Sequence, residues 1–284
     1  MWTSNGSKYS LTFGSTYFEV DAALGGRITA LRVDGQELLA DAATTGQEHY
    51  WGSTFWPSPQ QDHFLPPIGQ SSIATIDNQP YAAELDGDVL TLTSALNPSP
   101  PAVRVTKKFC PDFAKEAMVL DYTLSNGGAV PVAVAPWEVT RVPGGGVTFY
   151  PEASPPVCLH SFWTLPPTTL SAGVRWFQHD PRMAGDTKFF ADGQGGWLAH
   201  AAGDLLLIKT FPDILPQQSP AGESEIEIYA APRYVEVEQQ GAVETLPVGG
   251  SSAHWTVRWY ARKLAAPVAL GSADVVTYVQ NQIK

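Results

Sequence analysis

Apolar and polar residues alternate with a period of two along most of the chain, in short runs that end at turn residues. A period of two places successive side chains on opposite faces of a β-strand. Asp-Gly pairs at 34–35 and 86–87 separate such runs and predict β-hairpins, because this dipeptide readily supplies positive φ angles. Further strands are expected at 102–110, 117–125, 131–141, 204–211, 225–230, 233–239 and 253–263. The pattern therefore predicts a protein that is mostly β.

Two of these strands differ in how their apolar residues are distributed. In 253–263, Trp255 and Trp259 share one face with other apolar residues, which is typical of a strand that buries one side. The stretch 205–211 is apolar on both faces, as expected of a central strand covered on both sides. Lys209 lies within this apolar stretch, and a buried lysine needs a partner. We therefore expect Lys209 to meet a carboxylate.

Helical periodicity is convincing only at the C-terminal end of the chain. Ser272 is a suitable N-cap, and four apolar residues after it share one helix face: Val275, Val276, Val279 and Ile283. The Pro-rich stretches are interrupted by aromatic residues, and no linker-like shift in composition divides the sequence. We therefore predict one all-β domain over residues 1–284 that ends in a short helix.

Composition and charge narrow the partners. The chain has 284 residues, 44% of them hydrophobic and only 16% charged, with 25 Gly and 24 Pro, which excludes disorder and suits a globule with many turns. Its net charge is −11 and no stretch gathers Lys and Arg, so neither nucleic acid nor an anionic membrane is an expected partner. The N-terminus lacks a basic region followed by an apolar core. A cytoplasmic location is expected on this basis, with a periplasmic or secreted one left open.

The sequence contains none of the common cofactor or metal motifs. A P-loop, Gly-x-Ser-x-Gly, His-Glu-x-x-His and Cys-x-x-Cys are all missing, and the six His residues show no close ligand spacing. Cys110 and Cys158 are expected to be buried thiols, with a disulfide between them as the alternative. We expect neither a metal nor a cofactor.

The loop at 49–63 has the densest mixture of aromatic and polar side chains. It contains Trp51, Trp56, Gln60 and His63. Tryptophan faces stack on the C–H faces of sugar rings, while amide and imidazole groups hydrogen-bond hydroxyls, so this composition suits a neutral carbohydrate. The alternative interpretation is a Pro-stiffened loop whose two tryptophans cap the core.

A second polar feature lies at 234–240. Alternation places Glu236, Glu238 and two other polar residues on one face and Val235 and Val237 on the other. Partly buried carboxylates on such a face are suited to general base catalysis on a sugar hydroxyl. A solvated acidic face is the competing interpretation.

The segment Pro-Trp-Glu-Val-Thr-Arg adds two further candidates. Glu138 and Arg141 offer a hydrogen-bonding pair, although a regular strand points them to opposite faces. For these two residues, as for Lys209, a structural ion pair is an alternative to a role at a site.

The ends of the sequence resemble those of galactose mutarotase (aldose 1-epimerase)-like proteins. The residues that carry the resemblance are Tyr17-Phe18-Glu19-Val20, Gly25 to Leu31 and Asp34 to Leu39 at the start, and Glu238-Gln239-Gln240, Leu246-Pro247-Val248-Gly249 and the strand from Trp255 to Tyr260 at the end. Two central segments, 51–57 and 136–141, suggest an uncharacterised bacterial branch of that superfamily. The resemblance spans residues 9 to 263 by order of elements more than by identity.

This resemblance implies a β supersandwich whose concave face holds a mono- or oligosaccharide, and a reaction that interconverts sugar anomers without a cofactor. Glu238 matches the family's catalytic base. The family's His-x-Tyr-Phe motif, which supplies the acid, is missing, so the acid is expected to be Glu138, His63 or His179. Trp51, Trp56, Gln60, Arg141, Lys209 and Glu236 are the expected sugar contacts.

Two other functions remain open at this point. A polysaccharide lyase, or another glycoside-processing enzyme on the same scaffold, would use Lys209 and Arg141 to neutralise a uronate carboxylate. A sugar-binding protein without activity would explain the missing histidine motif.

Overall fold

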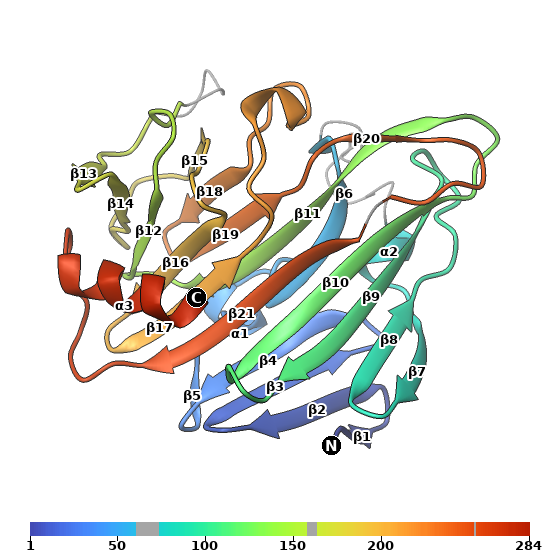
Figure 1. The fold of residues 1–284 in the computed structure, drawn as a ribbon, viewed down its shortest axis with the longest axis horizontal. Coiled ribbons are helices and arrows are strands. Elements are labelled where there is room, and N and C mark those ends of the chain that lie inside the picture. Colours follow the sequence, from blue (N-terminus) through green and yellow to red (C-terminus); the bar gives the residue numbers. More distant parts are fainter. Residues whose placement is uncertain (61–73, 158–163, 253) are drawn as a thin grey trace.

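The computed structural model describes residues 1–60, 74–157, 164–252 and 254–284. Two large antiparallel sheets make up most of the molecule (Figure 1). The first sheet has the strand order β1-β2-β3-β4-β6-β11-β19-β18-β15, with β5 paired to β4 and β20 to β11. The second has the order β13-β14-β12-β16-β17-β21-β10-β9-β8-β7. The prediction of an all-β sandwich is confirmed.

The strands of the first sheet are β1 (Thr3–Asn5), β2 (Lys8–Phe13), β3 (Thr16–Asp21), β4 (Arg27–Val33), β5 (Gln36–Glu37), β6 (Ser53–Ser58), β11 (Val132–Pro143), β15 (Thr187–Ala191), β18 (Ile226–Ala231), β19 (Tyr234–Gln240) and β20 (Glu244–Leu246). Those of the second are β7 (Ala82–Asp86), β8 (Val89–Thr93), β9 (Val103–Asp112), β10 (Ala117–Asn126), β12 (Val147–Pro151), β13 (Thr169–Ser171), β14 (Val174–Gln178), β16 (Trp197–Ala202), β17 (Leu205–Thr210) and β21 (Trp255–Lys263). The helical pieces are α1 (Ala42–Thr45), α2 (Ala74–Asp77), the 3₁₀ turn η2 (Pro216–Gln218) and α3 (Ala273–Ile283).

Both predicted hairpins form, but their turns differ. Val33 pairs with Gln36, so Asp34 and Gly35 make a two-residue turn with φ angles of 49° and 77°. This is the type I′ geometry expected of Asp-Gly. In the second hairpin Asp86 pairs with Val89, so Asp86 is the last strand residue and the turn begins at Gly87.

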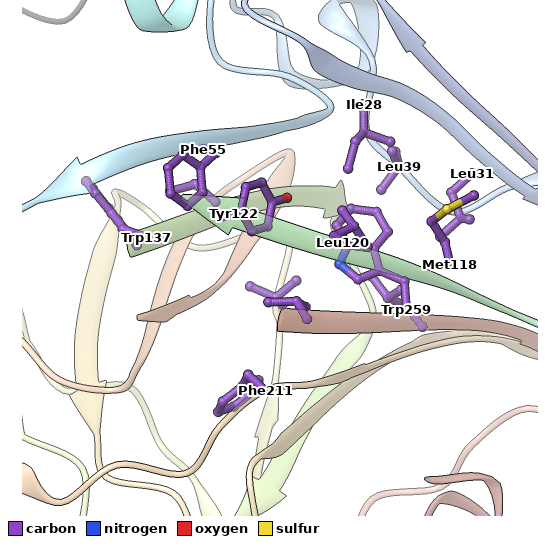
Figure 2. Packing of buried hydrophobic residues seen from close by; sticks show 14 of the residues in the cluster. Ile28, Leu31, Leu39, Phe55, Met118, Leu120, Tyr122, Trp137, Phe211 and Trp259 are labelled. Atoms are coloured by element: carbon purple, nitrogen blue, oxygen red, sulfur yellow. The ribbon is translucent and has the colours of Figure 1, made fainter. Parts of the chain in front are cut away.

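The main core lies between the two sheets. Figure 2 shows aromatic side chains of both sheets meeting there, with Phe55 of β6 facing Tyr122 of β10. Their rings are stacked with centroids 4.2 Å apart. Trp259 of β21 is in the same apolar cluster and is almost fully buried. Apolar contacts across this interface therefore hold the sheets together.

A second, smaller core lies beneath α3, which packs beside β12, β16 and β17 (Figure 1). The Ser272 hydroxyl accepts a hydrogen bond from the Val275 N–H, as its N-cap role predicts. Val275 and Val279 are buried against Trp176 and Tyr260. The C-terminal helix is thus confirmed, and it covers the outer face of the second sheet. Among the described residues, no helix combines the length and apolar character that crossing a bilayer needs.

An ion pair is buried inside the main core. Lys209 of β17 lies 2.8 Å from Glu138 of β11, and both side chains are fully buried. The Lys209 ammonium also donates to the Thr140 hydroxyl at 2.6 Å. Glu138 accepts hydrogen bonds from Tyr122 and from the Trp259 indole, which belong to the second sheet. The prediction that Lys209 meets a carboxylate is confirmed, and the pair joins the two sheets.

We expect Lys209→Met to lower the free energy of unfolding by roughly 3–5 kcal/mol, because it leaves a buried carboxylate without its cation. Adding Glu138→Gln to the Lys209→Met variant should recover part of the lost free energy of unfolding, since no uncompensated buried charge then remains. Urea denaturation measures both effects. As a control, Arg32→Gln at the exposed pair with Glu37 should cost less than about 1 kcal/mol. A similarly small loss for Lys209→Met would contradict this account.

Another lysine, Lys107 of β9, is buried without a carboxylate in hydrogen-bond contact among the described residues. Its ammonium donates to the carbonyl oxygens of Gly25 and Gly26, at 2.7 and 3.0 Å. It also lies 5.2 Å from the centroid of the Tyr81 ring. Burial lowers the pKa of Lys107 to about 7. Neutral carbonyls and ring faces thus compensate this charge only in part.

This depressed pKa predicts a pH dependence of stability. Between pH 7 and 10.5 the unfolded chain holds the Lys107 proton while the folded protein has released it. The free energy of unfolding therefore rises with pH across this window, and it falls as the pH drops toward 7. Lys107→Met should flatten the rise between neutral pH and pH 9 in denaturant titrations. An unchanged slope in that variant would show that other groups cause the dependence.

Candidate functional site

A pocket with a volume of about 220 Å³ opens on the first sheet. Five neighbouring strands, β6, β11, β19, β18 and β15, and the two segments that flank β6 supply its lining. The lining residues are Tyr50, Trp56, Gln60, Trp137, Arg141, Lys188, Tyr229, Tyr234 and Glu236. Residues between these positions in β6 and β11, such as Phe55 and Glu138, contact the second sheet. Because side chains alternate along a strand, the pocket lies on the face turned away from that sheet.

Strand register brings the polar residues of the pocket into a row. Arg141 of β11 is paired with Glu236 of β19, Glu236 with Tyr229 of β18, and Tyr229 with Lys188 of β15. In the next row along the same face, Glu238 is paired with Glu227. Directly paired side chains of neighbouring strands are close enough to interact. The alternation of β19 and β18 therefore produces a compact charged site.

Aromatic rings form the walls of the pocket. The Trp56 and Trp137 rings meet edge to face with centroids 5.2 Å apart. The Trp56 indole N–H donates to the Asp77 carboxylate at 2.7 Å, which fixes the orientation of the ring. Asp77 is in turn 3.5 Å from the buried Arg27 guanidinium. Both rings are almost fully buried, so they contribute apolar wall to the pocket with only a small part of their surface.

Arg141 stands at one side of the pocket and is fully buried. Its Nε donates to Glu236 at 2.7 Å and its Nη1 to the Thr54 hydroxyl at 2.8 Å. The guanidinium also lies 5.1 Å from the centroid of the Trp56 ring. Nη2 has no hydrogen-bond partner among the described residues. A buried donor without a partner carries a cost in free energy, which a hydrogen bond to an oxygen atom of a ligand would relieve.

Lys188 connects the pocket to two buried carboxylates beneath it. Its ammonium lies 2.6 Å from Glu227 and 3.2 Å from Glu238, and both of these side chains are fully buried. The same Oε2 atom of Glu238 accepts a hydrogen bond from the Trp137 indole at 2.9 Å. The other oxygen, Oε1, has no partner among the described residues. Glu238 therefore touches the pocket lining through Lys188 and Trp137 and keeps one oxygen unpaired.

The electrostatics of this cluster follow from one ammonium shared by two carboxylates. Burial alone would lower the pKa of Lys188, but the charges of Glu227 and Glu238 outweigh it and raise that pKa. Burial raises the pKa of Glu238 well above its ordinary value, against the opposing effect of Lys188. Lys188 is nearer to Glu227, so Glu238 is the carboxylate whose negative charge is less fully compensated.

Gln60 is held in the pocket by carboxylates on both sides. Its backbone N–H donates to Glu223 at 2.6 Å, and its side-chain amide donates to Glu227 at 3.1 Å. The amide oxygen accepts from Lys188 at 3.3 Å. Gln240 donates to both Glu223 and Glu227, at 2.7 and 2.6 Å. The end of β6 is thus tied to the loop before β18 by a continuous hydrogen-bond network.

The structure brings together part of the predicted site. Trp56, Gln60, Arg141 and Glu236 line the pocket, and Glu238 lies directly beneath it. Trp51 does not line it; its ring packs under the Arg27 guanidinium, 4.9 Å from the ring centroid.

Other predicted site residues lie elsewhere. Glu138 and Lys209 face the second sheet, in the buried pair described above. His179 is buried, with Nδ1 accepting from the Gly145 N–H and Nε2 facing the Ala231 carbonyl, both at 2.8 Å. His63 lies outside the described residues, as does Cys158, whereas Cys110 is a half-buried free thiol. The candidate acids Glu138 and His179 are therefore not in the pocket.

Six residues of the site were missed in the sequence: Tyr50, Trp137, Lys188, Tyr229 and Tyr234, which line the pocket, and Glu227, which pairs with Lys188 beneath it. Glu227 and Tyr229 alternate with Ile226 and Ile228, a signal equal to the one that marked β19. Lys188 gave no such signal, because it precedes two phenylalanines in a strand of only five residues. No group of three or more metal-ligating side chains occurs in the described parts of the chain.

Comparisons with known proteins place this geometry in a fold family. No family model and no curated protein sequence matches the chain. Several solved structures, in contrast, match most of the chain. A proposed aldose 1-epimerase from Klebsiella pneumoniae has a TM-score of 0.61 at 9% identity, covering 99% of this chain and 85% of that one. A galactose mutarotase-like protein from Lactobacillus casei has a TM-score of 0.59 at 11% identity, covering 89% and 99%.

A second galactose mutarotase-like protein, from Clostridium acetobutylicum, has a TM-score of 0.59 at 10% identity, covering 93% of this chain and 98% of that one. Identities this low establish the fold and leave the activity to be argued from the site. The chain has the galactose mutarotase-like β-sandwich fold.

Proposed function

We propose that the protein binds a neutral carbohydrate in the pocket of the first sheet and interconverts its anomers. The observation that carries the proposal is the combination of two tryptophan rings in the pocket wall with a buried, partly unpaired carboxylate beneath them. Trp56 and Trp137 provide apolar walls, and Arg141, Lys188 and Glu236 provide hydrogen-bonding groups for hydroxyls. The similar structures named for mutarotases and aldose 1-epimerases support the same choice.

Anomer interconversion begins with removal of the proton from the anomeric hydroxyl. We assign this step to Glu238, through its unpaired Oε1. Burial raises the pKa of Glu238, which makes its carboxylate a stronger base than an exposed glutamate. The sugar ring then opens, the bond between C1 and C2 rotates, and reclosure gives the other anomer.

A binding protein without turnover is the second candidate. It is favoured by one observation: no histidine of the described chain lines the pocket, although the family's acid is a histidine. A lyase that joins Lys209 and Arg141 on a uronate finds no support. Arg141 pairs with Glu236 on the pocket face of β11, whereas Lys209 of β17 pairs with Glu138 on the opposite face of that strand.

We expect the wild-type protein to accelerate anomer exchange of at least one common aldose, measured by NMR saturation transfer. Glu238→Gln should slow this exchange by about 100-fold or more, the usual contribution of a general base. Glu84→Gln, on the exposed edge strand β7 of the other sheet, is the matched control and should retain the wild-type rate. Sugar binding without exchange in the wild type would favour the binding protein instead.

The aromatic wall of the pocket is tested by comparing Trp56 of β6 with Trp51, which precedes that strand. Trp56→Ala should weaken sugar binding by about tenfold, equivalent to about 1.4 kcal/mol, because it removes a wall of the pocket. Trp56→Phe, which keeps an aromatic face, should weaken it less. Trp51→Ala should leave the affinity unchanged, since Trp51 lies outside the lining. Calorimetric titration measures all three, and equal losses at both positions would contradict the assigned pocket.

A further inference from the structure

Ring opening needs a proton donor as well as a base, and the sequence left the donor unassigned. The anomeric oxygen and the ring oxygen of a sugar are bonded to the same carbon. The donor and the acceptor must therefore stand side by side in the pocket, each within hydrogen-bond reach of its own oxygen. This requirement limits the candidates to proton-carrying groups next to Glu238.

Most polar residues of the pocket fail this requirement. Tyr234 lies four residues before Glu238 on the same strand, about 13 Å away at the usual rise per residue. The Tyr229 hydroxyl donates its proton to Asp186. Arg141 is paired with Glu236 and does not release a proton in proteins.

Lys188 meets the requirement. Its ammonium lines the pocket and lies 3.2 Å from Glu238, closer than any other cation of the described chain. It has three N–H donors, directed to Glu227, Glu238 and Gln60 in the absence of a sugar. The contact with Gln60 is the longest of the three, at 3.3 Å, and is the one that a ligand oxygen would most easily replace.

From this arrangement we infer that Lys188 is the proton donor to the ring oxygen, in place of the missing histidine; the inference rests on the proposed function. Glu238 takes the proton of the anomeric hydroxyl, and the electron pair of that O–H bond forms the C1 carbonyl. The bond between C1 and the ring oxygen breaks, its electron pair stays on the oxygen, and the oxygen takes a proton from the Lys188 ammonium. Reclosure on the other face of the carbonyl returns both protons.

The shared carboxylates explain how a lysine in this position can release a proton. In the resting site two negative charges hold the ammonium. When Glu238 becomes protonated by the substrate, one of these charges disappears, and the attraction that retains the Lys188 proton weakens. Proton uptake by the base therefore promotes proton release by the acid. Glu227, 2.6 Å from the ammonium nitrogen, keeps the lysine in place throughout the reaction.

The test compares two substitutions of Lys188 with one at a surface lysine. Lys188→Gln removes the proton donor and should reduce anomer exchange by about 100-fold or more, while sugar affinity changes by less than about tenfold. Lys188→Arg keeps the positive charge between the carboxylates but does not release a proton, so it should bind sugar and also lose exchange. Lys8→Gln, at an exposed pair with Glu19, is the control and should behave as the wild type.

Exchange rates from NMR and affinities from calorimetry separate the outcomes, and circular dichroism verifies that each variant is folded. Lys188→Arg keeps the ion pairs, so it provides the test if Lys188→Gln does not fold. A Lys188→Arg variant that exchanges anomers at the wild-type rate would overturn the inference, because the charge alone would then suffice. A wild-type protein that binds sugar without exchanging anomers overturns the proposed function itself. If exchange is lost in Glu238→Gln but kept in both Lys188 variants, only the role of Lys188 is overturned.

Discussion

The structure depends on the need to pair charges that are buried on both faces of β11 and on one face of its neighbour β19. β11 and β19 lie in the middle of the first sheet, and neither has a solvated face along its central residues. Glu138 enters the core and pairs with Lys209, while Arg141 and Glu238 face the pocket and pair with Glu236 and Lys188. A register shift of one residue would exchange these faces and leave each charge without its partner. The ion pairs therefore fix the register that also assembles the site.

The two faces use their charges differently. In the core, Glu138 is saturated by Lys209, Tyr122, Trp259 and Gln239, so no oxygen is left for a ligand. Beneath the pocket, Glu238 has contacts at only one of its oxygens within the described chain. A saturated buried carboxylate contributes to stability and specificity of folding, whereas an unsaturated one is held at a cost in free energy. That difference leaves Glu238, and not Glu138, with an oxygen that has no partner in the described chain.

Much of the fold could be predicted from the sequence, because the apolar run of β17, the alternation in β19 and β21 and the cap at Ser272 are local signals. The same alternation assigned Glu236 and Glu238 to one face, and Glu138 and Arg141 to opposite faces. Alternation does not indicate which face of a strand is turned toward the second sheet and which toward the pocket. Lys209 and Glu138 were expected near the sugar for this reason, yet they face the second sheet. Lys188 became recognisable only through its register with Tyr229, a pairing between residues 41 positions apart in the sequence.

The charge balance of the pocket bears on the chemistry of the carbohydrate that we propose as its ligand. Each cation that lines it already has a carboxylate partner: Arg141 has Glu236, and Lys188 has Glu227 and Glu238. An anionic sugar entering this site would find no uncompensated positive charge among the described residues, and it would lie close to three carboxylates. Repulsion of this kind is strongest where water is excluded, as it is around the fully buried Glu227 and Glu238.

A neutral sugar is not repelled by this arrangement, because its hydroxyls can donate to carboxylate oxygens and accept from Arg141 Nη2. The net charge of −11 adds a long-range field of the same sign. The local and the overall electrostatics thus both support a neutral sugar over a uronate.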